Sequence, residues 1–193
     1  MNACLSLETR TLAVVQCVKT LLALQQHVVL AIDGGTAAGK SSLAAQLAAR
    51  FHCVPIQTSD FFLPLALRTP ARLHEAGGMI DYARFAREVS PFLGTDAPFS
   101  YRVFDYDSDT FTKSKTILPC AVTIVEGIYS HHPALCAHYD LHVFLKIDAS
   151  TQKERILQQG DAALYENFKE QSMPMEHQYF DVFNIDEKSD FTL

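Results

Sequence analysis

The sequence has no tryptophan, no run of basic residues and no uninterrupted apolar stretch long enough to cross a membrane. Its 193 residues carry a net charge of −6, whereas binding to a nucleic-acid backbone calls for a clustered cationic face. Three charged residues, Glu8, Arg10 and Lys19, interrupt the apolar N-terminal segment, which argues against a targeting peptide and against a transmembrane helix of about 20 residues. We therefore expect no nucleic-acid partner and no membrane contact, and we interpret residues 8–25 as an amphipathic helix.

Cysteine is scarce and follows no pattern. The five cysteines, Cys4, Cys17, Cys53, Cys120 and Cys136, are an odd number without the C-x2-C spacing of zinc sites, so neither a zinc site nor a disulfide framework is indicated. We interpret them as reduced, small apolar side chains of a cytoplasmic protein. With 48% hydrophobic residues, the chain is long enough to form one domain over residues 1–193.

The most informative stretch is rich in glycine, and its residues 34–41 follow the pattern Gly-x4-Gly-Lys-Ser of a phosphate-binding loop, or P-loop. Glycine lets successive backbone N–H groups point at phosphate oxygens. Lys40 would contact the β and γ phosphates of ATP, and the Ser41 hydroxyl would complete the coordination shell of Mg²⁺. The expected nucleotide-binding residues are Gly34, Gly35, Thr36, Ala37, Ala38, Gly39, Lys40, Ser41 and Ser42.

The surroundings of the P-loop have the order of strand, loop and helix that the pattern requires. Residues 28–32 form a continuous apolar run typical of a buried strand. Behind the loop, Leu43, Leu47 and Phe51 recur at helical spacing, and the helix is expected to begin near residue 39 or 40. Its N-terminal partial positive charge would face the bound phosphates.

Three further apolar runs, at 53–58, 121–125 and 141–148, predict more strands. Strands separated by helices and long crossovers favour an α/β fold of the P-loop NTPase type, with a mainly parallel sheet and helices on both faces. In such sheets, ligands bind beyond the carboxyl ends of the strands. Asp60 and Glu126 each follow one of these runs, so we expect both at the edge of the sheet where the P-loop lies.

The segments between the main strands give weaker signals. Asp81 is the expected N-cap of a helix that runs to about Leu93. The alternating segment 99–106 predicts exposed strands or a hairpin outside the main sheet. His131 and His132 have no partner at metal-ligand spacing, and we expect them to begin a helix and to have a structural or solvent-exposed role.

Several motifs besides the P-loop follow one another in a specific order. They are Asp60-Phe61-Phe62, Ile80-Asp81-Tyr82-x-Arg84-Phe85, Phe99-Ser100-Tyr101-Arg102-Val103-Phe104-Asp105, Ile124-Val125-Glu126-Gly127-Ile128-Tyr129-Ser130 and Pro174-Met175-Glu176-x-x-Tyr179-Phe180. With these motifs, the chain from Val28 onward resembles the uridine kinase family of P-loop kinases, in particular its short bacterial uridine-kinase-like branch. The resemblance implies transfer of the γ phosphate of ATP to a hydroxyl of a small metabolite, with a nucleoside as the first candidate. It also implies an acceptor-binding insertion at about 61–118 and a small helical lid at about 153–175.

The resemblance further implies roles for individual residues. Asp60 would accept or orient the proton of the acceptor hydroxyl, and Lys40 and Arg155 would complete the catalytic group. Glu126 and Ser41 would be the protein's contributions to the Mg²⁺ shell. The expected acceptor-binding residues are Asp60, Asp81, Tyr101, Arg102, Phe104 and Asp105. For Asp81 a helix cap is an equal alternative, and for the aromatic residues of 99–106 the alternative is packing alone.

Departures from the family pattern leave the acceptor open. Phe104 and Asp109 stand where uridine kinases carry a histidine and a tyrosine that contact the pyrimidine. Gln158 and Gln159 stand where relatives tend to carry basic lid residues. One alternative is therefore a kinase of another small acceptor, such as a pantothenate-like compound or a sugar. A second is an ATP-binding sensor or regulatory protein with a depleted lid. The sequence is compatible with a homo-oligomer and does not decide the oligomeric state.

Overall fold

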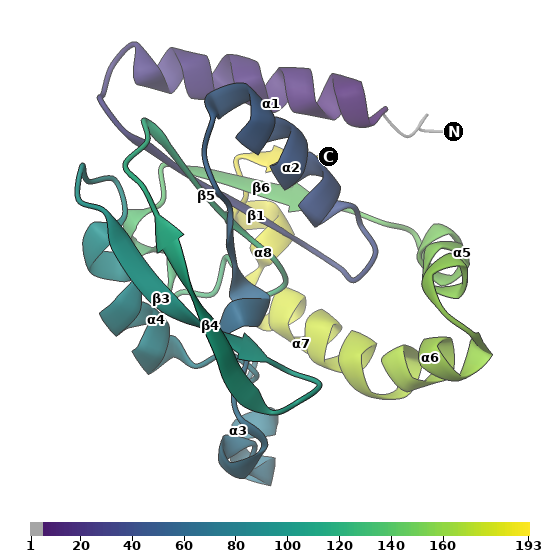
Figure 1. The fold of residues 1–193 in the computed structure, drawn as a ribbon. Helices are drawn as coiled ribbons and strands as arrows, with labels where there is room; N and C mark the ends of the chain where they lie inside the picture. Colours follow the sequence, from purple (N-terminus) through teal and green to yellow (C-terminus); the bar gives the residue numbers. More distant parts are fainter. Residues whose placement is uncertain (1–5) are drawn as a thin grey trace.

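The computed structural model describes residues 6–193, which form a five-stranded parallel sheet with helices on both faces (Figure 1). Its strands are β1 (Val28–Gly34), β2 (Ile56–Gln57), β5 (Val122–Glu126), β6 (Leu141–Leu145) and β7 (Phe191–Thr192), in the order β2-β5-β1-β6-β7. Two antiparallel strands, β3 (Phe99–Asp105) and β4 (Thr110–Ile117), form a separate hairpin. The α/β fold of the P-loop NTPase type is confirmed, as is the hairpin outside the main sheet.

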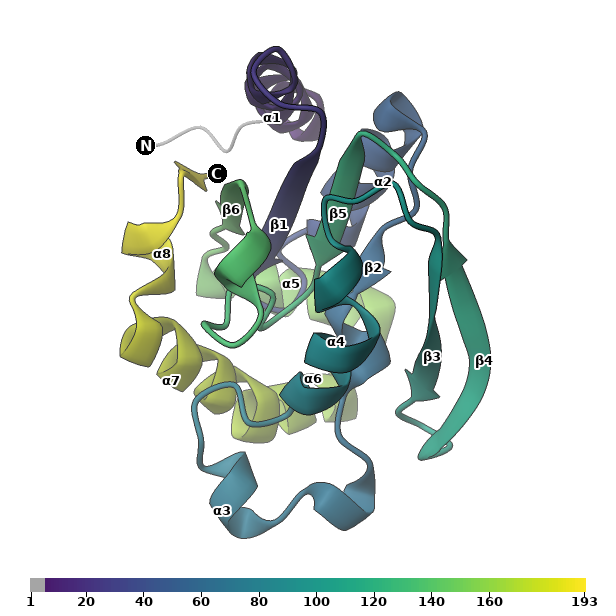
Figure 2. The ribbon, with the colours of Figure 1, turned by 90° about the vertical axis from the view of Figure 1, so that its left-hand side faces the viewer.

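Helix α1 precedes β1, and the other helices of the described residues lie in the connections between strands. They are α1 (Leu7–Leu22), α2 (Lys40–Phe51), α3 (Pro70–Leu73), α4 (Tyr82–Glu88), α5 (Ala149–Gln159), α6 (Ala162–Asn167), α7 (Met173–Phe183) and α8 (Ile185–Lys188), with a π-helical stretch (Phe168–Ser172) between α6 and α7. Helices α5, α6 and α7 follow one another in an arc at one end of the sheet (Figure 1). The hairpin stands beside the edge formed by β2 (Figure 2).

Strand β1 lies at the centre of the sheet, and its side chains alternate between two apolar layers. Val28, Leu30 and Ile32 belong to a layer shared with α1 and α2. Val29 belongs to the opposite layer, to which α4, α7 and α8 contribute large side chains such as Phe85. All seven residues of β1 are buried, because helices cover both faces of a parallel sheet. The continuous apolar run in the sequence therefore has a direct structural cause.

Helix α1 agrees with the amphipathic helix expected at 8–25, although it ends three residues earlier. Ser6 caps it, since its Oγ accepts the N–H of Thr9 at 3.2 Å. Val14, Val15 and Val18 are buried in the layer that α1 shares with α2. None of the helices within residues 6–193 combines the length and the apolar character needed to span a membrane.

The helix expected from Asp81 to about Leu93 is shorter than predicted. Asp81 is its N-cap, because Oδ1 accepts the N–H of Arg84 at 3.0 Å. The helix ends at Glu88, and the chain continues as a 3₁₀ turn that contains Pro91. Proline has no backbone N–H for the helical hydrogen bond and disfavours helical backbone in the preceding residue, which explains the early end.

The helix expected to begin at His131 and His132 is not formed, and turns occupy this stretch of the described chain. Tyr129 has a φ of 72°, a left-handed conformation that a right-handed helix cannot include. Both histidine rings are buried. The ring of His132 stacks on Tyr82 with 4.2 Å between centroids, and its Nδ1 accepts the N–H of Ala134 at 3.1 Å. These contacts give His132 a structural role.

The buried state of His132 predicts a specific dependence of stability on pH. Burial lowers the pKa of this imidazole from 6.5 to about 4. Between pH 6.5 and about pH 4, the His132 imidazole is protonated in the unfolded chain but neutral in the folded protein. The free energy of unfolding should therefore fall as the pH falls through this window, by up to about 3 kcal/mol. In urea denaturation between about pH 7 and pH 4.5, His132→Phe should depend less on pH than the wild type, because its ring cannot be protonated. Equal pH dependence of the two proteins would contradict the assignment.

Four of the cysteines, Cys17, Cys53, Cys120 and Cys136, carry free thiols in this structure. Burial raises the pKa of the Cys53 thiol to about 12, so this side chain is an unreactive apolar group at neutral pH. Cys4 lies outside the described residues.

Candidate active site

The parallel register brings the ends of several strands to one edge of the sheet. Glu126, the last residue of β5, is aligned with Ile32 of β1 and with Gln57 of β2. The P-loop begins directly after Ile32 and Asp33, and the 3₁₀ turn that contains Asp60 begins at Thr58, directly after β2. The P-loop, Glu126 and Asp60 thus share the edge at which parallel sheets bind ligands.

The shape of the P-loop depends on its glycines. Gly34 has a φ of 145°, and a Cβ atom there would lie 2.4 Å from the carbonyl oxygen of Leu145 on the neighbouring strand. Gly39, with a φ of 100°, turns the chain into α2, which begins at Lys40 as predicted. The first N–H groups of α2, which have no partner within the helix, therefore point toward the loop.

Lys40 folds back over the P-loop. Its Nζ donates to the carbonyl oxygens of Gly34 at 2.8 Å and Gly35 at 2.9 Å. Burial lowers the pKa of this ammonium group, and the carboxylates of Asp33, Glu176 and Glu126 partly offset that effect. Two carbonyl oxygens of the loop therefore hold the Lys40 side chain in this structure.

Ser41 and Glu126 are in contact, with 3.3 Å between Ser41 Oγ and Glu126 Oε2. Glu126 is buried, and its other oxygen accepts from Gln57 Nε2 at 3.3 Å. A hydroxyl and a carboxylate suit Mg²⁺, which takes one or two protein oxygens and completes its shell with water and substrate phosphates. Within residues 6–193, no group of three or more His, Cys, Asp or Glu is arranged to hold a metal ion. The residues present therefore fit Mg²⁺ that arrives with a nucleotide.

The carboxylate of Asp60 is only 7% exposed and is held by residues of the hairpin. The hydroxyl of Tyr101 donates to Oδ2 at 2.8 Å. The Nζ of Lys115 lies 3.8 Å from the same oxygen and donates to the carbonyl oxygen of Pro55 at 2.7 Å. Burial, with the adjacent Asp60 charge, raises the pKa of Tyr101 far above its usual value, so its hydroxyl remains a donor. Among the described residues, Asp60 Oδ1 accepts no hydrogen bond.

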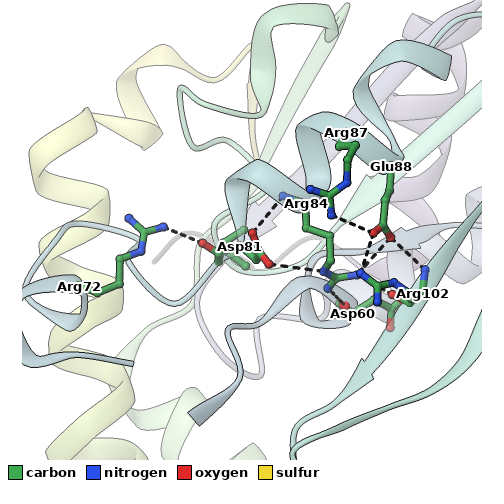
Figure 3. Close-up of polar contacts among 8 residues, drawn as sticks. Asp60, Arg72, Asp81, Arg84, Arg87, Glu88 and Arg102 are labelled. Carbon is green, nitrogen blue, oxygen red and sulfur yellow. Dashed lines mark hydrogen bonds and ion pairs between the residues drawn. The ribbon is translucent and has the colours of Figure 1, made fainter. Parts of the chain in front are cut away.

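Arg84 of α4 holds the backbone of Asp60 in place (Figure 3). Its guanidinium group is almost completely buried and donates to the carbonyl oxygens of Asp60 and, at 2.6 Å, Arg102. Ion pairs with Glu88 at 3.6 Å and Asp81 at 3.7 Å balance its charge. A buried arginine with these partners ties the turn of Asp60 to α4 and to β3 in one arrangement.

Within residues 6–193, Tyr101 is the only predicted acceptor-binding residue of β3 whose side chain forms a hydrogen bond with Asp60. Neighbouring residues of a strand point to opposite faces, so the Arg102 side chain lies on the other face, half exposed, and pairs with Glu88 at 3.2 Å. Asp105 accepts the N–H groups of residues 107 and 108 and thereby closes the turn between β3 and β4.

Two further predicted acceptor residues also have structural partners. Phe104 is buried and meets Phe111 edge to face, with 5.6 Å between ring centroids. Asp81 caps α4 and pairs with Arg84. The helix cap, which was the alternative to acceptor binding, is therefore observed. A part in acceptor binding stays a prediction for both residues.

Residues of α5 and α7 contact the P-loop directly. Gln152 Nε2 donates to the carbonyl oxygen of Thr36, and Arg155 Nη1 donates to that of Ala37, both at 2.9 Å. Glu176 of α7 accepts the N–H of Thr36 at 3.0 Å and also its hydroxyl. The helices expected to form the lid are thus anchored to the loop, with the expected catalytic residue Arg155 at the contact.

Sequence reasoning gave no role to four side chains of this site: Asp33, Arg84, Lys115 and Glu176. Arg84 and Glu176 stand within the motifs that carried the resemblance, which is a signal that could have singled them out. Asp33 is completely buried and accepts the hydroxyl of Tyr179 at 2.7 Å. A charged residue just before a P-loop glycine, at the end of an apolar strand, was the available signal. For Lys115 the sequence carries none, because it looks like an ordinary solvated strand residue.

The chain is similar in structure to P-loop kinases. With a possible uridine kinase from Bacillus stearothermophilus it shares 17% identity and a TM-score of 0.67, over 98% of this chain and 100% of that one. With a protein of Silicibacter sp. TM1040, provisionally assigned as a fructose transport system kinase, it shares 19% identity and a TM-score of 0.70, over 98% of this chain and 100% of that one. No protein-family model and no curated protein matched the sequence. These similarities confirm the resemblance at the level of the fold.

Proposed function

We propose that the protein is an ATP-dependent phosphotransferase that phosphorylates a hydroxyl of a small metabolite, with a nucleoside as the first candidate. The observation that carries this proposal is the buried carboxylate of Asp60, held by Tyr101 and Lys115 at the edge where the P-loop and Glu126 lie. A P-loop alone only binds a nucleotide. A positioned base beside it is what transfer to a hydroxyl requires.

The residues divide the reaction between them. Backbone N–H groups between Gly35 and Ser42, other than that of Thr36, which donates to Glu176, hold the phosphates. Lys40 moves from the loop carbonyls to the β and γ phosphates. Ser41 and Glu126 would hold Mg²⁺, which would neutralise phosphate charge. Asp60 Oδ1 takes the proton of the acceptor hydroxyl while the oxygen of that hydroxyl forms a bond to the γ phosphorus. The bond from that phosphorus to the bridging oxygen breaks, and ADP leaves.

The insertion at 61–118 would bind the acceptor, and the lid at 153–175 would close over the phosphates with Arg155 as its cation. Asp109, which stands at a pyrimidine-contacting position of uridine kinases, accepts the N–H of Leu65 at 2.7 Å and lies 3.8 Å from Arg68. Its carboxylate therefore stabilises the insertion itself. This contact favours testing acceptors beyond uridine.

The direct test is a panel of acceptors assayed for ADP formation with ATP and Mg²⁺. Uridine and other nucleosides come first, followed by fructose and other sugars and by pantothenate-like compounds. We expect one class to raise ADP formation well above the rate without acceptor, and the phosphorylated product should be identified by mass spectrometry. Absence of acceptor-dependent ADP formation across the panel would contradict the proposal for these classes.

A second candidate function is an ATP-binding sensor or regulatory protein. It is favoured by Gln158 and Gln159, because these neutral side chains line the cavity next to the P-loop, where relatives tend to carry basic lid residues. Tight binding of ATP without turnover for any acceptor would support this function. The cations Lys40, Arg155 and Lys115 at the site favour the phosphotransferase.

Lys115 provides a test of how Asp60 is positioned. Lys115→Met should lower kcat about tenfold, or about 1.4 kcal/mol, because the carboxylate loses its nearby cation, while the acceptor KM changes less. Lys115→Arg should recover part of the loss. The matched control is Lys113→Met, which removes an exposed lysine of the same strand. A normal kcat for Lys115→Met would show that Tyr101 and Arg84 suffice to hold Asp60.

A further inference from the structure

A cavity of about 520 Å³ lies beside the second half of the P-loop. Its walls come from the P-loop with the start of α2, from β6, from α5 and from the first turns of α1, which precede the P-loop strand in the sequence. The lining residues are Leu7, Arg10, Ala37, Ala38, Gly39, Lys40, Ser41, Ser42, Leu43, Leu145, Arg155, Gln158 and Gln159. The volume is within the usual range of small-molecule sites.

Helix α1 packs against α2 beside this cavity. Val14 and Val18 are completely buried in the apolar layer shared with α2. The hydroxyl of Thr11 donates to Oε1 of Gln46 on α2 at 2.6 Å. Since α2 starts at the P-loop, these contacts place the first turns of α1, with Leu7 and Arg10, next to the helix that begins at the phosphate-binding loop.

The charges around the cavity match a polyanion. Arg10, Lys40 and Arg155 all line it, and none of the lining residues within 6–193 carries a carboxylate. Ser41 and Ser42, which follow the lysine at the start of α2, line the same cavity as Arg10. Leu7 and Leu145 add apolar surface to the same cavity. A guanidinium group next to apolar walls suits a nucleoside triphosphate, which combines phosphates with a flat base.

We propose that α1 forms one wall of the ATP site and that Arg10 binds the phosphates of the nucleotide. This inference rests on the proposed function only in that ATP is the ligand of the P-loop. Arg10 thereby supplies a cation from outside the P-loop and the lid, and the neutral Gln158 and Gln159 are balanced by a charge that comes from the N-terminal helix.

Calorimetric titration with Mg²⁺-ATP and with Mg²⁺-tripolyphosphate, which has no base or ribose, tests the inference without any acceptor. Arg10→Gln should raise the Kd of both ligands about tenfold, and Arg10→Lys should raise it less. The matched control is Lys19→Gln, an exposed lysine of the same helix that is not in the cavity lining; its Kd values should equal those of the wild type. Urea denaturation of each variant checks that it is folded at the temperature of titration.

Leu7 offers an independent variant because it is 36% exposed and its replacement should not unfold the protein. Leu7→Glu should weaken the binding of both ligands through charge repulsion, whereas Leu7→Gln should not. Kd values for Arg10→Gln and Leu7→Glu within about twofold of the wild type would overturn the inference. If the variants lost affinity for ATP but not for tripolyphosphate, the proposed contact between Arg10 and the phosphates would be overturned. Failure of the wild type to bind ATP would overturn both the inference and the proposed function, whereas binding without acceptor turnover would affect the proposed function alone.

Discussion

Lys40→Met should remove most phosphoryl transfer while the protein stays folded. The ammonium group would contact the β and γ phosphates, where charge develops during the reaction, and loss of one such donor costs about 10² to 10³ in kcat. Methionine keeps most of the length of the side chain and removes the charge. Steady-state ADP formation with a saturating acceptor measures the effect.

The same substitution has a structural cost that must be separated from the catalytic one. In the free protein, Lys40 Nζ donates to the carbonyl oxygens of Gly34 and Gly35, and three carboxylates lie near it. We expect the free energy of unfolding to fall by about 1 to 3 kcal/mol, because these groups lose their partner. Urea denaturation gives the folded fraction of each sample, and Lys19→Met serves as the control. A loss of activity no larger than the loss of folded protein would contradict a catalytic role for Lys40.

The P-loop and the main sheet could be predicted because their signals are local. Gly34 must adopt a φ of 145° next to a neighbouring strand, so a glycine is required at that one position. A strand that is buried on both faces is apolar along its length. The register of parallel strands then places Glu126 at the loop without further information. The early end of α4 was missed, although Pro91 inside the expected helix was a local signal for it.

The surroundings of Asp60 could not be predicted, because they depend on pairing between distant segments. Lys115 reaches the carbonyl oxygen of Pro55, 60 residues away, and Glu176 reaches Thr36 across 140 residues. Nothing local distinguishes Lys115 from the exposed Lys113 on the same strand. The motif of 99–105 likewise gave Tyr101 and Arg102 the same predicted role, whereas the pleat of the strand sends them to opposite faces.

Asp60→Asn should separate phosphoryl transfer from nucleotide binding. Asparagine has nearly the same volume, and its side-chain oxygen can still accept the hydroxyl of Tyr101. It cannot take a proton from the acceptor hydroxyl. A positioned general base contributes about 10² to 10⁴ in rate, so phosphorylation of the acceptor should fall by about that factor.

The Kd of ATP should change by less than about twofold in this variant, because the P-loop N–H groups and Lys40 hold the nucleotide and Asp60 lies in the neighbouring turn. Asp107→Asn is the matched control, since it makes the same change at an exposed position in the turn of the hairpin. Full activity of Asp60→Asn would mean that the buried carboxylate only stabilises its turn through Tyr101 and Lys115. Equal weakening of ATP binding and of turnover would assign Asp60 to the nucleotide site, and the base would have to be sought elsewhere among the residues of the insertion.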